Sequence, residues 1–162
     1  MTLTRNRSPK LIALMEKAAE FHGHLGPFLA IGVRMGLIGL ERLGNPAYNS
    51  LVITASLPLH VPFSCIIDGL QVSTNCTVGN QKLSLEDSPI IQARFKRKDN
   101  KHGTLVALSM SMVEKMKTQL LQEALPKDEV HKLAWMIAGI SEDELFKITS
   151  DEPTRIPKIL IS

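Results

Sequence analysis

The chain has 162 residues and 44% hydrophobic content, enough for one substantial core, which predicts a single domain over residues 1–162. Its formal net charge of +3, with 22% charged residues of mixed sign, is too small to predict nucleic-acid binding. The sequence has no uninterrupted apolar run of about 18 residues, so we expect no membrane span. Two cysteines are too few for a disulfide scaffold, and no apolar leader follows Met1, so we expect a protein of the reducing cytoplasm.

The first predicted helix starts near the amino end. Ser8 followed by Pro9 is typical of a helix N-cap with proline at the first helical position. Apolar residues then recur at helical spacing from Leu11 to Ala19. This helix delivers the chain to Phe21, where the pattern ends.

Two histidines, His22 and His24, follow this helix in the stretch Phe-His-Gly-His-Leu-Gly-Pro over residues 21–27. Pro27 disfavours the α conformation for the residue before it, and the two glycines permit positive φ, so the stretch predicts a tight loop between helices. In an extended segment, side chains at i and i+2 point to the same face, so both imidazoles can converge on one metal ion or one substrate. Two solvated loop histidines are the alternative.

The second predicted helix runs over residues 27–43 and is apolar nearly all round, which predicts burial. Glycine is a poor helix former, so the three glycines in its interior predict close approach by another backbone. They are Gly32, Gly36 and Gly39. Arg34 is the charge in the middle of this helix, and either a buried ion pair or an anionic ligand would compensate its burial.

The two cysteines lie at either end of a third predicted helix. Residues 51–56 predict a short strand, and residues 63–72 predict a helix opened by a proline. Cys65 lies in the first turn, where the helix dipole lowers the pKa of a thiol; a small buried hydrophobe is the alternative. Cys76 lies in the polar loop over residues 73–80. We expect no disulfide between the two, and we favour Cys76 as a neighbour of the site over Cys76 as a ligand.

The second half of the chain predicts a hairpin followed by helices. Residues 82–85 indicate a short strand, and residues 90–96 and 103–110 indicate an antiparallel hairpin with alternating burial. Helical patterns follow over residues 113–125 and 127–138. Helices and strands mix without regular βαβ alternation, so the predicted class is α+β, with a mixed, mostly antiparallel sheet packed against helices.

The carboxyl-terminal part adds three smaller predictions. His131 and Trp135, at i and i+4 on one helix face, indicate a packing pair. Ser141 with Glu144 is typical of a capping box for a short last helix. Residues 153–162 indicate a β-like tail.

The chemistry of the two histidines and two cysteines points to a metal. Imidazole and thiolate suit zinc, and also nickel, iron or copper. The chain has no Cys-x-x-Cys pair, so we expect no structural zinc finger, and an open site with two or three protein ligands remains. The polar residues that can support such a site are Asp68, Gln71, Asn75 and Thr77.

Two motifs of this chain resemble those of the FmdE family of formylmethanofuran dehydrogenase components. The first is Phe-His-Gly-His followed by a proline over residues 21–27, with residues 32–35 downstream. The second is a Cys-x-x-Asp helix over residues 65–71 that leads into an Asn-Cys-Thr-x-Gly loop over residues 75–79. The likeness covers about residues 15–98, together with an element over residues 141–146 and the basic β-like tail, and the two motifs together are fairly specific.

The resemblance implies an α+β core, an intertwined homodimer and a metal site with histidine and cysteine ligands. It also implies a link to anaerobic one-carbon metabolism and methanogenesis, where the named enzyme interconverts carbon dioxide and formylmethanofuran using molybdenum or tungsten. Two positions depart from the family pattern: Gly26 stands where cysteine is common, and Asn80 where lysine is common. The first bears on any chemistry that needs an extra thiol, and the second on any phosphate or carboxylate contact made there.

We therefore expect one transition metal ion, zinc first with nickel or iron as alternatives, held by His22, His24 and Cys65. In one interpretation the protein is a metal-dependent enzyme, an oxidoreductase or a component of one, in which the catalytic residues are Cys65, Asp68 and Cys76. In the other it is a non-catalytic metal carrier, sensor or accessory subunit that uses the same site. A protein without a metal, whose cysteines lie in a core, is the third interpretation.

The partners follow from the same reasoning. The apolar second helix and the long hairpin exceed what one small core needs, which predicts a homodimer, as the resemblance also does. Other subunits of an oxidoreductase are further expected partners. We expect neither nucleic acid nor a membrane as a partner. The substrate and the metal used in the cell do not follow from the sequence.

Overall fold

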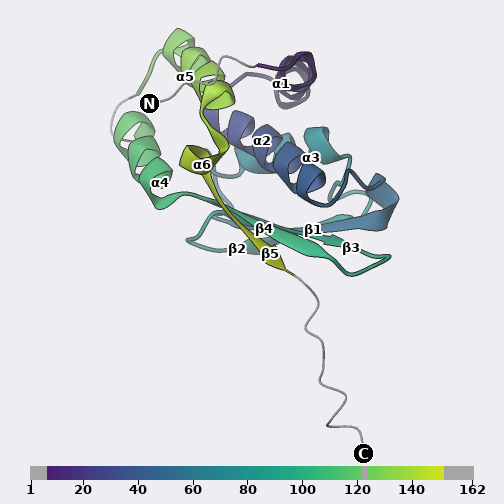
Figure 1. Ribbon diagram of the computed structural model, residues 1–162. Helices are drawn as coiled ribbons and strands as arrows, with labels where there is room; N and C mark the ends of the chain where they lie inside the picture. Colours follow the sequence, from purple (N-terminus) through teal and green to yellow (C-terminus); the bar gives the residue numbers. More distant parts are fainter. Residues whose placement is uncertain (1–6, 122–123, 152–162) are drawn as a thin grey trace, which may run out of the picture.

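The computed structural model describes residues 7–121 and 124–151 and shows an α+β fold, as predicted. Figure 1 shows a sheet whose one face is covered by helices α2 and α3, with α1 and α5 lying on the far side of these two. The five strands stand in the order β2-β1-β3-β4-β5.

The sheet is mixed and mostly antiparallel, which confirms the predicted class. The strands are β1 (Leu51–Leu57), β2 (Leu83–Asp87), β3 (Gln92–Arg97), β4 (Gly103–Leu108) and β5 (Phe146–Asp151). β1 pairs with β2 in parallel, whereas the β1–β3, β3–β4 and β4–β5 pairs are antiparallel. Ile53 lies opposite both Leu83 and Phe95, and all three are buried. Side chains of this register form the helix-facing side of the sheet.

Helices α1 (Pro9–His22) and α2 (Pro27–Arg42) form where the sequence predicts them. The Ser8 hydroxyl accepts a hydrogen bond from the backbone N–H of Leu11 at 3.1 Å, so the predicted N-cap is present. Gly23 ends α1 with a φ of 102°, a conformation that favours glycine. The two helices are therefore joined by a short loop that carries the second histidine.

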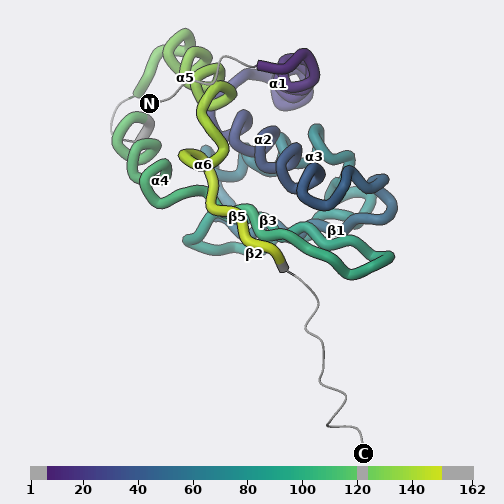
Figure 2. Tube along the Cα trace, viewed as in Figure 1, coloured from purple at the N-terminus to yellow at the C-terminus, as the bar shows by residue number. Residues whose placement is uncertain are grey.

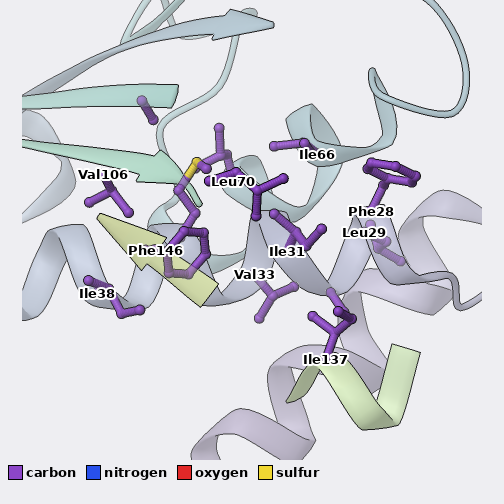
Figure 3. Close-up of a cluster of buried hydrophobic side chains, with 14 of the residues drawn as sticks. Phe28, Leu29, Ile31, Val33, Ile38, Ile66, Leu70, Val106, Ile137 and Phe146 are labelled. Atoms are coloured by element: carbon purple, nitrogen blue, oxygen red, sulfur yellow. The ribbon is translucent and has the colours of Figure 1, made fainter. Parts of the chain in front are cut away.

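Close packing of α2 against α3 (Cys65–Thr74) explains the glycines of α2. A Cβ on Gly32 would run into the backbone at Ile66 and Gly69, and a Cβ on Gly69 would run into the backbone of α2. A Cβ on Gly36 would meet the side chain of Ser73 instead. The predicted approach of another backbone is confirmed at Gly32. Figure 3 shows the apolar side chains around this contact, among them Ile66 and Leu70 from α3 with their neighbours on α2.

The rest of the chain differs from the predictions at its element ends. Helix α4 (Met110–Met116) begins three residues before the predicted helix because Ser109 caps it, so β4 also stops earlier than expected. It continues into a π-helical turn, η2 (Lys117–Leu121), and a 3₁₀ turn, η1 (Tyr48–Ser50), precedes β1. Helices α5 (Lys127–Gly139) and α6 (Glu142–Leu145) follow.

The predicted last helix is present as the short helix α6. Phe146, its predicted last residue, instead begins strand β5. The chain runs from α5 through α6 down to the sheet, where β5 pairs with β4 (Figure 2). Ser141 is the N-cap residue of α6, as predicted, but among the described residues its side chain makes no cap hydrogen bond, so the Ser141 half of the predicted capping box is wrong. The β-like tail over residues 153–162 lies outside the described residues.

Arg34 binds backbone carbonyls and, among the described residues, forms none of the ion pairs that the sequence suggested. Its guanidinium donates hydrogen bonds to the backbone carbonyls of Ile137, at 3.1 Å, and Ile140, at the carboxyl end of α5. Carbonyls at the end of a helix lack partners within it, and a cation there also suits the helix dipole. Arg34 therefore fastens α5 to α2. None of the helices in the described part of the chain is long and apolar enough to cross a membrane.

Candidate functional site

The two histidines of the first motif stand beside each other where α1 gives way to α2. The ring centroids of His22 and His24 are 4.8 Å apart, with the ring planes inclined by 40°. His22 is the last residue of α1, and the left-handed Gly23 turns the chain so that His24 stays on the same side. The glycine between them is thus what allows two imidazoles to meet at a helix end.

The first turns of α3 supply a thiol and a carboxylate to the same place. Cys65 is the first residue of α3, and Asp68 follows within the first turn. Oδ2 of Asp68 lies 2.6 Å from Nδ1 of His22, whose side chain is 14% exposed. A carboxylate that accepts a hydrogen bond from Nδ1–H leaves the other ring nitrogen, Nε2, with its lone pair free for a metal or a proton.

Asp68 is itself held in place from the other side. Nε2 of Gln71 donates to Oδ1 of Asp68 at 3.3 Å, and Oε1 of Gln71 accepts from the backbone N–H of Val78 at 3.0 Å. Gln71 thus links the carboxylate to the loop that follows α3. Asn75 and Thr77, the other predicted supporting residues, instead hydrogen-bond to Asn80 within that loop.

His22, His24 and Cys65 line a cavity of about 160 Å³. The rest of its wall is apolar and comes from Gly26, Pro27, Phe28, Leu29, Pro62 and Val130. No sequence signal pointed to Pro62 or Val130, because neither carries a reactive group and α5 reaches the site only through the tertiary fold. A small, mostly apolar cavity with two imidazoles and a thiol in its wall is suited to a ligand with one polar end.

Burial shifts the pKa of two of these groups in the direction that favours the neutral form. It raises the pKa of the Cys65 thiol, and the carboxylate of Asp68 raises it further. Burial likewise lowers the pKa of His24, and the nearby His22 and Lys127 add to this effect. The prediction that the helix dipole lowers the Cys65 pKa is therefore wrong for the chain without a metal, since desolvation outweighs the dipole.

Cys76, the second predicted cysteine, lies elsewhere. It is fully buried past the carboxyl end of α3, where its Sγ donates to the backbone carbonyl of Tyr48 at 3.8 Å, and burial raises its pKa. It is not among the described residues that line the cavity. Both cysteines are free thiols. The structure thus brings four of the predicted site residues together and leaves Cys76 apart.

The residues at this site have the chemistry of metal ligands but do not form a finished metal site. Within residues 7–121 and 124–151, no three histidine, cysteine, aspartate or glutamate side chains are arranged so that they could hold a metal ion. The donor set of two imidazoles and a thiol nevertheless fits a transition metal. Closing such a site from these positions needs side chains to turn.

The known proteins that are similar to the chain include the following two. One is a tungsten formylmethanofuran dehydrogenase FmdE-like protein from Syntrophus aciditrophicus, whose crystal structure matches with a TM-score of 0.61 over 96% of this chain and 79% of that one. At 20% identity this likeness shows the fold alone. The other is a probable S-adenosyl-L-methionine-binding protein from Archaeoglobus fulgidus, 35% identical over 111 residues. That match covers 68% of this chain but 30% of the relative, so the chain spans less than a third of that protein.

The family assignment rests on a longer match. Residues 21–150, from the first histidine motif to the last strand, fit the family model described as FmdE, molybdenum formylmethanofuran dehydrogenase operon. This range contains both motifs and every described residue that lines the cavity. The resemblance carried by the two motifs is confirmed, and the chain belongs to the FmdE family.

Proposed function

We propose that the chain binds one transition metal ion, zinc first, through His22, His24 and Cys65, and that it is a metal-dependent enzyme or enzyme component related to formylmethanofuran dehydrogenase. The observation that carries this proposal is that two imidazoles and a thiol, from segments far apart in the sequence, line one small cavity. Membership of the FmdE family supports the relation to the dehydrogenase.

Each side chain has a definite task in this proposal. Asp68 is a positioning residue, because its hydrogen bond to Nδ1 of His22 fixes the ring and leaves Nε2 as the metal-binding atom. Cys65 keeps its proton until the ion displaces it, since burial raises the pKa of its thiol. A transition metal held there supplies Lewis-acid chemistry. The apolar wall beside the ligands limits access of water and leaves room for a substrate.

A non-catalytic metal carrier or sensor is the second candidate function. It is favoured by the finding that, within the described residues, no ligand set is assembled in advance. A site that forms only as the ion binds loses the ion more readily than a rigid one. The two functions differ in whether the metal ion is transferred. An enzyme keeps its metal ion through turnover, whereas a carrier passes it to an apo-protein acceptor.

The wider assignment is also a proposal. We place the protein in anaerobic one-carbon redox metabolism of the methanogenic type, in the cytoplasm, where it acts as a homodimer and with other oxidoreductase subunits. A homodimer accounts for exposed apolar side chains such as Val61 and Ile90, which are 77% and 59% exposed. Light scattering that gave the 17.9 kDa monomer mass at micromolar concentration would exclude the homodimer.

The metal proposal is tested by elemental analysis of protein expressed with metal supplied. Plasma emission spectrometry should find about one equivalent per chain, and element-resolved anomalous scattering from crystals grown without added metal should place it beside His22, His24 and Cys65. His22→Ala should remove most of the metal. His102→Ala is the matched control, because His102 is exposed in the turn of the β3–β4 hairpin. Less than half an equivalent in the unmodified protein would rule out the site.

A further inference from the structure

A second, larger hollow adjoins the candidate metal cavity. It has a volume of about 690 Å³ and lies between the loop at residues 23–25 and the start of α5. Leu125, Lys127, Val130 and His131 line its α5 side. His24 and Val130 line both this hollow and the smaller cavity. A molecule in the hollow therefore lies directly beside the proposed metal ligands.

The polar side chains of this hollow are those that recognise an anion. Lys127 is exposed and, among the described residues, forms no ion pair. His131 presents a fixed donor: its Nε2 accepts a hydrogen bond from Nε1–H of Trp135 at 3.1 Å, and the indole N–H can only donate. The neutral imidazole of His131 must then carry its proton on Nδ1, which remains as a donor.

The described wall of this hollow contains a cationic side chain and no anionic one. No carboxylate is among the described residues that line the hollow. Asp128 and Glu129 lie in the same helical turn as Lys127, but the Glu129 carboxylate pairs with Lys132 at 3.4 Å. The amino end of α5 adds partial positive charge beside the hollow.

We propose that this hollow is an anion subsite, in which Lys127 and His131 bind the carboxylate or phosphate group of a small molecule whose other end enters the cavity lined by His22 and Cys65. The second half of this inference rests on the proposed metal-binding function. It assigns a substrate class, small organic acids or phosphate esters. The ammonium of Lys127 gives the anion a hydrogen bond between opposite charges, and the Nδ1–H of the neutral His131 gives it a second hydrogen bond, which the charge of the anion assists.

The first experiment follows the His131 imidazole resonances by NMR during titration with acetate or inorganic phosphate. Saturable shifts are expected with at least one of the two anions, and the tighter one identifies the group. Lys127→Ala should weaken that binding about tenfold, because it removes a hydrogen bond to a charged group. Lys96→Ala is the matched control, since it makes the same charge change at an exposed position of β3 that does not line the hollow, and it should leave affinity unchanged. Failure of both anions to saturate, or equal losses in the two variants, would overturn the subsite.

The second experiment tests the link between the two hollows in the metal-loaded protein. A series of ω-mercaptocarboxylic acids of two to six carbons should include one member that binds about tenfold more tightly than the alkanethiol of the same length. Lys127→Ala should abolish that preference. If no member shows it, the link is wrong.

Metal content, measured on the same samples, separates this inference from the proposed function. If the protein takes up no metal when metal is supplied but still binds the anion through Lys127, the metal proposal is contradicted and the subsite is retained. A full equivalent of metal with no anion binding would retain the metal proposal and overturn the subsite alone.

Discussion

The two ends of α3 each carry a cysteine, and the fold gives the two thiols opposite surroundings. Cys65 at the amino end lines the cavity with His22 and His24. Cys76, just past the carboxyl end, is buried against the backbone of Tyr48. Burial raises the pKa of both thiols, so this property does not separate them. They differ in their neighbours: Cys65 lies beside two imidazoles and Cys76 does not. This makes Cys65 a candidate ligand and Cys76 a core residue.

The largest expected difference between the two cysteines appears when each is replaced in turn by serine. Cys65→Ser should weaken metal binding by about 100-fold or more, because a hydroxyl is a poor substitute for a thiolate. Cys76→Ser should leave metal content unchanged while lowering the free energy of unfolding by about 1–2 kcal/mol, since it buries a hydroxyl in place of a thiol. Metal content and denaturant titration of both variants check this. Comparable metal loss in both would show that Cys76 is a ligand.

The next effect comes from the carboxylate at the amino end. Asp68→Asn should lower metal affinity about 10- to 100-fold, because the amide no longer accepts a charge-assisted hydrogen bond from Nδ1–H of His22. Competition with a chromophoric chelator measures the affinity. Asp99→Asn is the control, since Asp99 accepts from Arg97 in the turn of the β3–β4 hairpin and does not line the cavity. Equal affinities in wild type and Asp68→Asn would remove Asp68 from the site.

Glycine replacements in α2 displace the two ends of α3 separately. Gly32→Ala should cost about 2–3 kcal/mol of stability, because its methyl group meets the backbone at Ile66, and should lower metal affinity several-fold by shifting the turn that carries Cys65. Gly36→Ala meets the movable side chain of Ser73 and should cost about 1–2 kcal/mol without changing metal affinity. Thermal unfolding and metal competition check both variants. Equal metal loss would mean that α3 moves as a rigid unit.

The smallest expected effect on metal affinity comes from Gln71, which links Asp68 in the first turn of α3 to the loop after this helix. Gln71→Ala should lower metal affinity only about two- to threefold, because it removes a single 3.3 Å hydrogen bond from an Asp68 that keeps its contact with His22. It should also loosen the loop after α3, since the backbone N–H of Val78 loses its acceptor. Hydrogen exchange at Val78 measures the second effect. Unchanged exchange there would show that Gln71 does not hold the loop.

The anion subsite extends the comparison beyond α3. The amino end of α3 faces α5 through Val130, which lines both hollows. Cys76, past the other end, is fully buried and lines neither of them. Ligand recognition is therefore expected at the amino end of the helix.

Local signals in the sequence determined much of this molecule. The Ser8 cap, the proline starts and the alternating hairpin each depend on neighbouring residues, and they placed α1, α2, α3 and the β3–β4 pair close to their observed bounds. The two motifs likewise placed His22, His24, Cys65 and Asp68 at one site. These features are readable because capping, backbone conformation and periodicity act over a few residues.

Only the tertiary structure decided the rest. Phe146 begins a strand because β4 offers it an unpaired edge, although the local pattern indicates a helix. Arg34 donates to carbonyls of α5, about a hundred residues away, and Val130 and Lys127 reach the histidines by the same packing. The thiol pKa of Cys65 rises because desolvation depends on every segment that covers the site, whereas the helix dipole that suggested the opposite is local.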